Sequence, residues 1–369
     1  MNGLPALRIA AVPGDGVGPE VMDVTLPLLE AAAAFDGRSL QVVELDWGGE
    51  RYLRTGEAMP QDAASQLRAF DAVLFGAVGR LDIPAHVSVW GLILLLRQEL
   101  DLFVNLRPVW SWEGVETPLR DSDGSDFLVV RENSEGEYTG MGGRSHVGSD
   151  AEVAIEVAVH TRRAIERVAH YAFRQARERR GSLALVTKSN ASKYGYVLWD
   201  EVVAGIHERY PDVELEYVFV DAMAARMIQR PRSLDVLLCS NLFGDILSDL
   251  GAPIQGGLGM APSANIRPDG GAPGIFEPVH GSAPDIAGQQ IANPIACVLS
   301  AAMLLSECGC PLGAAALREA VRQSLAALDP RTRDIGGTAT TAEAAHAIGD
   351  RLAGAAETLR LDARPGGTR

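Results

Sequence analysis

The sequence predicts an α/β fold with a largely parallel sheet. Short apolar runs at 7–12, 41–45 and 72–76 alternate with longer helical patterns, and such alternation is typical of βαβ units. The 369 residues suffice for one large core or two joined domains. The composition, with 47% hydrophobic and 22% charged residues, is that of a folded globular protein.

The first predicted strand, Leu7–Val12, leads into the glycine-rich segment PGDGVGPE and then into a helical pattern. A strand, a glycine turn and a helix together form the context of the dinucleotide fingerprint G-x-G-x-x-G. Gly14 and Gly16 fit, but Pro19 stands where the third glycine belongs and lacks an amide donor for phosphate. We therefore expect either a structural turn or a differently built cofactor loop.

The later segments continue the alternation of strands and helices. Helices are predicted at 62–70, 90–100, 149–180, 294–306, 312–328 and 340–357. A further helix around GDILSDL is expected to end at the glycine and proline that follow it, where a loop begins. Gly270–Asn293 is predicted to be one long Gly/Pro loop, which in a compact domain usually serves function. The tail at 363–369 is expected to be frayed.

The charge balance excludes one broad class of partner. The chain carries 33 basic and 48 acidic residues, a formal net charge of −15. Nucleic-acid-binding proteins usually carry a basic face, so we expect no nucleic-acid partner. An anionic small molecule would instead need a local cluster of positive side chains.

The sequence also gives expectations about location. The longest apolar run, at 89–96, is far shorter than the roughly 20 residues of a membrane span. The strand-like LRIAAV begins without a basic and apolar signal segment before it. The chain is poor in cysteine, and the four thiols, at 239, 297, 308 and 310, are expected to be reduced. We therefore predict a cytoplasmic protein with no membrane association.

Asp245 and Asp249 are the candidate metal ligands. They stand four residues apart, so on a helix both carboxylates project from one face. Hard divalent ions such as Mg²⁺ and Mn²⁺ accept carboxylate oxygens, often one or two from protein with the remainder from water and substrate. The alternative, that one aspartate caps the helix and the other is solvated, stays open on spacing alone.

Other charged residues lie at the ends of apolar segments. Arg97 is placed in a helical pattern, whereas Arg107 and Arg131 lie within or just after strand-like runs. Lys188 and Asp221 also end predicted strands, where α/β sheets usually place their chemistry. Each could be an ordinary structural charge, but three arginines in an acidic chain favour a clamp for carboxylates.

Four segments together resemble the β-decarboxylating dehydrogenases, the isocitrate and isopropylmalate dehydrogenase family. These segments are RQELDLFVNLRPV, VVRENSEGEYTGMGGR, SNLFGDILSDLGA with GLGMAPSANI, and EPVHGSAPDIAG. The resemblance runs from VPGDGVGPE to DIGG at 334–337 and so covers nearly the whole chain. It implies an isopropylmalate dehydrogenase-like fold, with a large mixed sheet flanked by helices. It also implies a discontinuous large domain, 1–102 with 257–369, into which a small domain, 103–256, is inserted.

The resemblance implies a cofactor loop that differs from the Rossmann fingerprint. The residues carried over to dinucleotide binding are Glu277, His280, Gly281, Asp285 and Asn293. NADP-dependent relatives have Lys-Tyr where this chain has Asp285 and Ile286. A carboxylate can accept hydrogen bonds from ribose hydroxyls and repels an added phosphate, so NAD is the expected cofactor.

The resemblance also assigns roles to the charged residues. It implies that the substrate carboxylates are held by Arg97, Arg107 and Arg131. It implies that Mg²⁺ or Mn²⁺ is bound by Asp221, Asp245 and Asp249. Tyr138 and Lys188 match the catalytic acid and base, and in the family Lys188 and Asp221 come from the other subunit of a homodimer with shared active sites. A requirement for K⁺ and any assembly beyond a dimer are left open.

The implied reaction is the oxidative decarboxylation of a small 2-hydroxy diacid. Lys188 would remove the hydroxyl proton as hydride leaves for NAD, and it must then be neutral, which requires a lowered pKa. Loss of CO₂ from the resulting β-keto acid leaves an enolate, which the metal and positive side chains stabilise. Tyr138 would then protonate the carbon.

The residues before Arg97 are expected to determine the substrate. HVSVWGLILLLR supplies Trp90, Gly91, Leu92 and Ile93, and these four offer no hydroxyl or basic partner for the extra carboxylate of isocitrate. Trp90 is expected to fill the space that an isopropyl group would need. The SVWG and RENSEGEY patterns most resemble the tartrate and D-malate branch, so D-malate or tartrate is the predicted substrate, with 3-isopropylmalate as the alternative. A non-catalytic regulatory subunit and a metal-dependent hydrolase are the rival classes.

Overall fold

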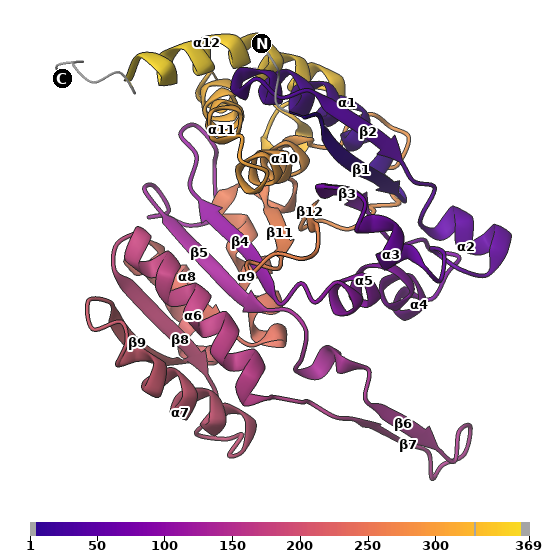
Figure 1. The fold of residues 1–369 in the computed structure, drawn as a ribbon, viewed down its shortest axis with the longest axis vertical. Coiled ribbons are helices and arrows are strands. Elements are labelled where there is room, and N and C mark those ends of the chain that lie inside the picture. The colour runs from indigo at the N-terminus through magenta and orange to yellow at the C-terminus, as the bar shows by residue number, and fades with distance from the viewer. Residues whose placement is uncertain (1–4, 328–329, 363–369) are drawn as a thin grey trace.

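A ten-stranded sheet runs through the centre of the molecule (Figure 1). The computed structural model describes residues 5–327 and 330–362. In order across the sheet, the strands are β2 (Leu40–Glu44), β1 (Leu7–Gly14), β3 (Ala72–Ala77), β12 (Gly274–Pro278), β11 (Pro262–Ile266), β4 (Val104–Trp110), β5 (Asp126–Glu132), β10 (Val236–Cys239), β8 (Ser182–Thr187) and β9 (Glu214–Phe219).

The sheet is mixed, with its antiparallel part in the middle. The three pairings β12–β11, β11–β4 and β4–β5 are antiparallel, and the pairings on both sides of them are parallel. The parallel strands at one end belong to the first 77 residues together with β12, and those at the other end belong to the middle of the chain. The expected large mixed sheet flanked by helices is therefore confirmed. The division into an inserted small domain and a discontinuous large one stays a prediction.

Helices cover both faces of the sheet. Their bounds are α1 (Gly18–Ala33), α2 (Gly49–Thr55), α3 (Ala63–Leu67), α4 (Ala85–Val89), α5 (Leu95–Glu99), α6 (Arg162–Glu178), α7 (Gly195–His207), α8 (Val220–Gln229), α9 (Asn241–Gln255), α10 (Ile295–Glu307), α11 (Pro311–Ala326) and α12 (Thr341–Asp362). A π-helical turn, Trp90–Leu94, joins α4 to α5. Short 3₁₀ turns occupy Ala34–Asp36, Glu137–Thr139, Pro231–Ser233, Leu258–Met260 and Arg333–Ile335.

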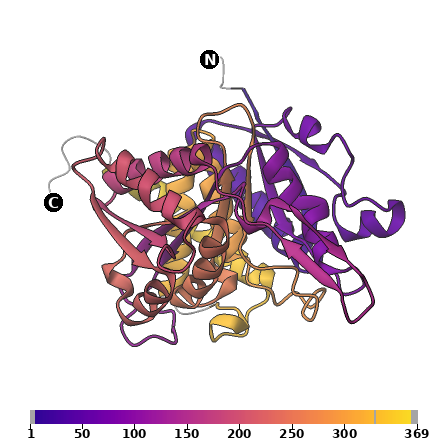
Figure 2. The ribbon, with the colours of Figure 1, turned by 90° about the horizontal axis from the view of Figure 1, so that it is seen from below.

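Strand alternation determines which helices lie on which face. In β5, Leu128 and Val130 pack in the core with α6 and α7, whereas Phe127 and Val129 pack with α8 and α9. Successive side chains of a strand point to opposite faces, so these helix pairs cover opposite sides of the sheet. Viewed from below, the indigo N-terminal elements lie on one side and the red helices of the middle of the chain on the other (Figure 2). No helix within 5–327 or 330–362 is long and apolar enough to cross a membrane.

The prediction of one helix over 149–180 was wrong. The helix α6 begins at Arg162, after the N-cap Thr161, whose side chain accepts from the Ala164 amide. The preceding residues form a hairpin of β6 (Gly142–Ser145) and β7 (Val153–Glu156), which projects from the molecule (Figure 1). The alternation in EVAIEVAV suits a strand as well as a helix, and pairing with β6 decides between them.

Two further boundaries differ from the predictions. The helix α9 continues through Pro253 to Gln255 and ends at Gly256, whose φ of 112° is in the left-handed region. The expected loop after it contains β11, and the predicted loop 270–293 contains the buried strand β12, Gly274–Pro278. The strands β11 and β12 form although glycine and proline signals favour loops there, because pairing at the centre of the sheet outweighs those signals. Residue 328 of the last-but-one predicted helix and the tail 363–369 lie outside the described residues.

Candidate active site

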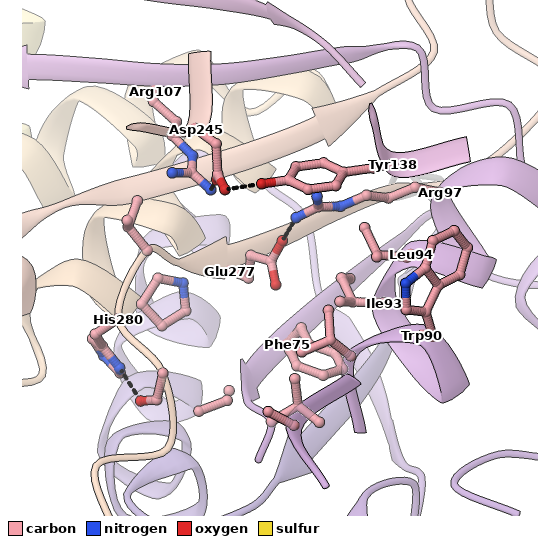
Figure 3. A pocket seen from close by; sticks show the side chains of 18 of the residues that line it. Phe75, Trp90, Ile93, Leu94, Arg97, Arg107, Tyr138, Asp245, Glu277 and His280 are labelled. Atoms are coloured by element: carbon pink, nitrogen blue, oxygen red, sulfur yellow. Dashed lines mark hydrogen bonds and ion pairs between the residues drawn. The ribbon is translucent and has the colours of Figure 1, made fainter. Parts of the chain in front are cut away.

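A cavity of about 480 Å³ lies beside the strands β3, β12, β4 and β5 (Figure 3). Its lining has an apolar side and a charged side. The apolar side includes Phe75, Val78, Val89, Trp90, Ile93 and Leu94. The charged side includes Arg97, Arg107, Arg131, Tyr138, Asp245 and Glu277, and His280 and Gly281 complete the lining from the loop after β12.

The three predicted arginines come together at this cavity, from α5, β4 and β5. The exposed fractions of Arg97, Arg107 and Arg131 are only 6%, 7% and 1%. Burial is the main cause that lowers the pKa of Arg107, and it lowers that of Arg131 to about 9. Like charges so close together require anions nearby, and the cavity supplies room for a substrate anion beside them.

Asp245 is the anion that already neutralises part of this cluster. Its Oδ1 lies 2.5 Å from Arg131 Nη1 and 3.4 Å from Arg107 Nη2. Burial opposes ionisation, but Arg131 and Arg107 outweigh it and keep the pKa of Asp245 below its ordinary value. Asn241, at the start of α9, accepts from Arg131 Nε through its side-chain oxygen at 3.0 Å and so orients the guanidinium.

Asp249 lies one turn along α9, as the four-residue spacing predicts. Its Oδ1 is 3.2 Å from Arg107 Nη1, and its side chain is 57% exposed. Burial is the main cause that raises its pKa, and the neighbouring Asp245 raises it further. A divalent cation would relieve this repulsion, and two carboxylates on one helix face are the oxygen donors that Mg²⁺ or Mn²⁺ prefers. The residues present therefore fit such an ion.

Asp221 and Lys188 lie apart from the cavity. Asp221, at the start of α8, pairs with Lys188 Nζ at 2.8 Å, and neither residue lines the cavity. The hydrogen bond from Lys188 lowers the pKa of Asp221. Within 5–327 and 330–362, no three His, Cys, Asp or Glu side chains of one chain are placed to hold a metal ion. One chain thus brings together Asp245 and Asp249 but not Asp221.

Tyr138 projects into the cavity from the 3₁₀ turn Glu137–Thr139 (Figure 3). Its hydroxyl donates to Asp245 Oδ2 at 3.0 Å. Burial first, and then the negative charge of Asp245, raises the pKa of Tyr138 to about 12. The phenol is therefore protonated at neutral pH and available as a proton donor.

Glu277 belongs to the charged side of the cavity. Its Oε1 accepts from Arg97 Nη2 at 2.8 Å and from Asn265 Nδ2 at 2.8 Å. Arg97 and Glu277 are 180 residues apart in sequence, and β12 and α5 bring them together. The predicted cofactor residue is thus also the ion-pair partner of a predicted substrate residue.

Loop residues His280 and Gly281 connect the first cavity to a second one. This adjoining cavity, of about 520 Å³, is lined mainly by apolar residues. Its lining comprises Val17, Leu258, Gly259, His280, Gly281, Ala283, Ile286, Ile291, Ala292, Asn293, Arg333 and Asp334. Burial lowers the pKa of His280, and its buried Nε2 has no partner within 5–327 and 330–362. An apolar slot beside a buried ring nitrogen fits the flat base of a dinucleotide.

The other predicted cofactor residues differ in position. Asn293 lines the second cavity, but its amide donates to Asp334 Oδ2 at 3.0 Å and its oxygen accepts from the Ile295 amide at 3.0 Å. Asp285 is exposed and lies outside the lining of both cavities. Asp334 was not predicted as a site residue, although it begins the DIGG segment that carries the resemblance.

Of the four residues predicted to determine the substrate, two line the first cavity. Trp90 and Ile93 line the first cavity, but Leu92 is buried in the core and Gly91 is not part of the lining. Leu94 lines the cavity instead, because helical turns place residues 90, 93, 94 and 97 on one side. Gly140 lies against the Trp90 ring, where a Cβ would come within 2.8 Å.

Comparison with known proteins decides the family. The model of the isocitrate/isopropylmalate dehydrogenase family matches residues 8–350. The chain belongs to this family. The predicted recognition is therefore confirmed, and with it the prediction of an enzyme of the dehydrogenase class.

Members of the isocitrate/isopropylmalate dehydrogenase family resemble the chain over nearly its full length. A probable tartrate dehydrogenase/decarboxylase TtuC' of Agrobacterium vitis is 45% identical over 94% of this chain and 98% of its own. The D-malate dehydrogenase [decarboxylating] of Escherichia coli (strain K12) is 45% identical over 93% of this chain and 97% of its own. The crystal structure of isocitrate dehydrogenase from Methylococcus capsulatus superposes with a TM-score of 0.86 at 36% identity, covering 94% of this chain and 99% of that one.

Proposed function

We propose that this dehydrogenase catalyses the NAD-dependent and divalent-metal-dependent oxidative decarboxylation of D-malate or tartrate. The observation that carries the proposal is the convergence of Arg97, Arg107 and Arg131 on one cavity that also holds Tyr138 and Asp245. Buried guanidiniums bind carboxylates bidentately, and a 2-hydroxy diacid presents two of them. The names of the tartrate and D-malate relatives support this substrate class.

Each side chain has a task in the proposed reaction. The arginines hold the two carboxylates of the substrate, and Asp245 and Asp249 would hold Mg²⁺ or Mn²⁺ at the edge of the same cavity. When bound, the metal would supply a Lewis acid for the C2 oxygen, and NAD would supply the acceptor for the hydride of C2. Lys188 takes the proton of the C2 hydroxyl. After the C3–C4 bond breaks and CO₂ leaves, Tyr138 donates its proton to C3, which gives the 2-keto acid.

Lys188 is suited to a base because it is one of two lysines in a chain whose other basic residues are arginines. Lys188 and Lys193 are the only lysines among the 33 basic residues. Arginine stays protonated at any ordinary pH, whereas a lysine can lose its proton when its surroundings disfavour the charge.

The position of Lys188 supports a homodimer with shared active sites. Lys188 and Asp221 lie outside the cavity of their own chain, and the Asp221 side chain is 71% exposed. The projecting hairpin also exposes apolar side chains, among them Val147 and Ile155 at 68% and 59%. A second copy of the chain would cover these surfaces and bring its own Lys188 and Asp221 to the cavity of the first.

A complementation experiment tests the shared site. Lys188→Ala and Tyr138→Phe each remove one proton-transfer residue, so each homodimer should lose about 99% or more of its turnover. A heterodimer of the two variants would contain one intact site of two, with Tyr138 from one chain and Lys188 from the other. Co-refolding the two variants should therefore restore about half of the wild-type turnover per heterodimer. No restoration would mean that each site is built within one chain.

3-Isopropylmalate is the second candidate substrate, because one side of the cavity is apolar. Trp90, Ile93 and Leu94 could contact an alkyl substituent. The bulk of Trp90 argues against a branched one. Steady-state assays with NAD, Mn²⁺ and each acid decide between them. A preference for 3-isopropylmalate of more than about tenfold in kcat/KM would overturn the assignment.

A regulatory subunit and a hydrolase are the non-dehydrogenase alternatives. A regulatory subunit should form no NADH with any of these acids. The presence of Tyr138, Lys188 and the three aspartates argues against this alternative. A hydrolase would cleave phosphate or ester substrates without NAD. The cytoplasmic location and a requirement for K⁺ stay predictions.

A further inference from the structure

The segment PGDGVGPE lies against the cofactor loop, which we define as residues 279–293. The glycines of this segment serve close packing of the backbone. A Cβ on Gly16 would come within 1.9 Å of the Ser282 carbonyl oxygen, and the Val17 amide donates to that same oxygen at 2.8 Å. The segment PGDGVGPE, which does not match the phosphate-binding fingerprint, therefore packs against the cofactor loop and supports it.

Glu20 makes the most specific contacts between the two segments. It lies in the first turn of α1 and is only 7% exposed. Its Oε1 accepts from the Gly288 amide, and its Oε2 accepts from the Gln290 amide at 3.0 Å. One buried carboxylate thus satisfies two backbone donors of the cofactor loop.

The cofactor loop needs such support because its backbone is strained. Ala283 and Gln290 adopt φ values of 40° and 57°, a region that residues with a Cβ rarely occupy. Strained backbone persists only where surrounding contacts determine it, and such positions cluster at ligand sites. Gln290 is fixed on both sides, by Glu20 at its amide and by the Thr341 amide, which donates to its carbonyl at 2.9 Å.

Asp15 fixes the segment that carries Glu20. Its carboxylate is 4% exposed and accepts from the Gly49 amide at 2.8 Å and from the Gly79 amide at 2.9 Å. Gly49 is the first residue of α2 and Gly79 follows β3, so Asp15 joins the turn after β1 to the start of α2 and to the segment after β3. The support for the cofactor loop is therefore anchored to the sheet.

We propose that Glu20 is a positioning residue for the dinucleotide site, acting through the cofactor loop. It lines neither cavity, whereas Ala283, Ile286 and Ile291 of the loop line the second one. Without the carboxylate, Gly288 and Gln290 lose their acceptors and the strained loop relaxes away from the shape of this cavity. The inference rests on the proposed function in so far as NAD is the ligand of the second cavity.

The test compares Glu20→Gln with a matched control, Asp36→Asn. Asp36 also accepts two backbone amides, from Leu312 at 3.2 Å and from Gly313 at 2.7 Å, but it lies outside the lining of both cavities. In Glu20→Gln the KM for NAD should rise about tenfold or more, while kcat at saturating NAD changes less than about twofold. Asp36→Asn should lower the Tm without changing the KM for NAD. Glu20→Asp, which keeps two acceptor oxygens, should recover part of the affinity.

Hydrogen exchange separates this inference from the proposed function. In the enzyme without NAD, amides of the cofactor loop should exchange faster in Glu20→Gln than in the wild type, and Asp36→Asn should leave them unchanged. Unchanged exchange of the loop, or a fall in kcat with an unchanged KM for NAD, would overturn the positioning role. Faster exchange in a protein whose wild type binds no NADH by fluorescence would instead overturn the proposed cofactor while leaving the support of the loop by Glu20 established.

Discussion

Two sets of ion pairs, one buried and one at the surface, differ in how completely one chain encloses them. Arg107 and Arg131 meet Asp245 in the interior, with guanidinium side chains that are 9% and 2% exposed. Lys188 and Asp221 pair at the surface, with side chains that are 28% and 71% exposed. The first set lines the cavity, whereas the second lies outside it and is accessible at the surface of the chain. This difference supports the proposal that the substrate binds in the cavity of one chain and that a second chain completes the active site.

The largest expected effect tests the surface pair. Lys188→Ala should reduce kcat by about 10³-fold or more, because no other base replaces it. Binding of NADH, measured by fluorescence, should stay within about twofold of the wild type. Lys193→Ala is the control, because it removes the only other lysine of the chain and should leave turnover nearly unchanged. Full turnover in Lys188→Ala would show that the surface pair is merely structural.

The next largest effect tests the buried set. Tyr138→Phe removes the hydroxyl that contacts Asp245 and should lower the rate of product formation about 10²-fold, with a small change in Tm. With its pKa raised to about 12, the phenol stays protonated through the neutral and mildly alkaline range. A loss of activity between pH 8 and pH 10 should therefore have the same midpoint in Tyr138→Phe as in the wild type. A shifted midpoint would assign that titration to Tyr138.

The sequence predicted the buried set better than its surroundings. The spacing of Asp245 and Asp249 predicted their common helix face. The arginines in an acidic chain favoured a clamp, and the structure brings Arg107 and Arg131 to one cavity. The pairing of Arg97 with Glu277 could not be predicted, because it depends on how α5 and β12 meet across the fold. The hairpin at 142–156 was missed for a similar reason, since its residues suit a helix until a partner strand is present.

A smaller effect distinguishes the two aspartates of α9. Asp249→Asn should raise the Mn²⁺ concentration needed for half-maximal activity about tenfold, because one hard oxygen ligand loses its charge. The wild-type pKa of Asp249 is raised mainly by burial, so its carboxylate takes up a proton at a higher pH than an ordinary aspartate does. The Mn²⁺ requirement of the wild type should therefore increase as the pH falls toward that pKa. The same titration in Asp249→Asn should be flatter, and an equal slope would remove Asp249 from the metal site.

The smallest effect on turnover concerns the apolar side of the cavity. Trp90→Ala would enlarge this side next to Gly140 while leaving every charged residue in place. An added methylene in an apolar pocket changes discrimination by about 10- to 200-fold, so kcat/KM for 3-isopropylmalate relative to D-malate should rise within that range. Turnover of D-malate should fall only a few-fold, because its carboxylates keep their arginines.

Leu92→Ala is the control, since Leu92 is buried in the core. This substitution should lower the Tm without changing the preference between the two acids. An unchanged preference in Trp90→Ala would mean that the substituent on the substrate points away from the π-helical turn Trp90–Leu94, and that the charged side alone selects the substrate.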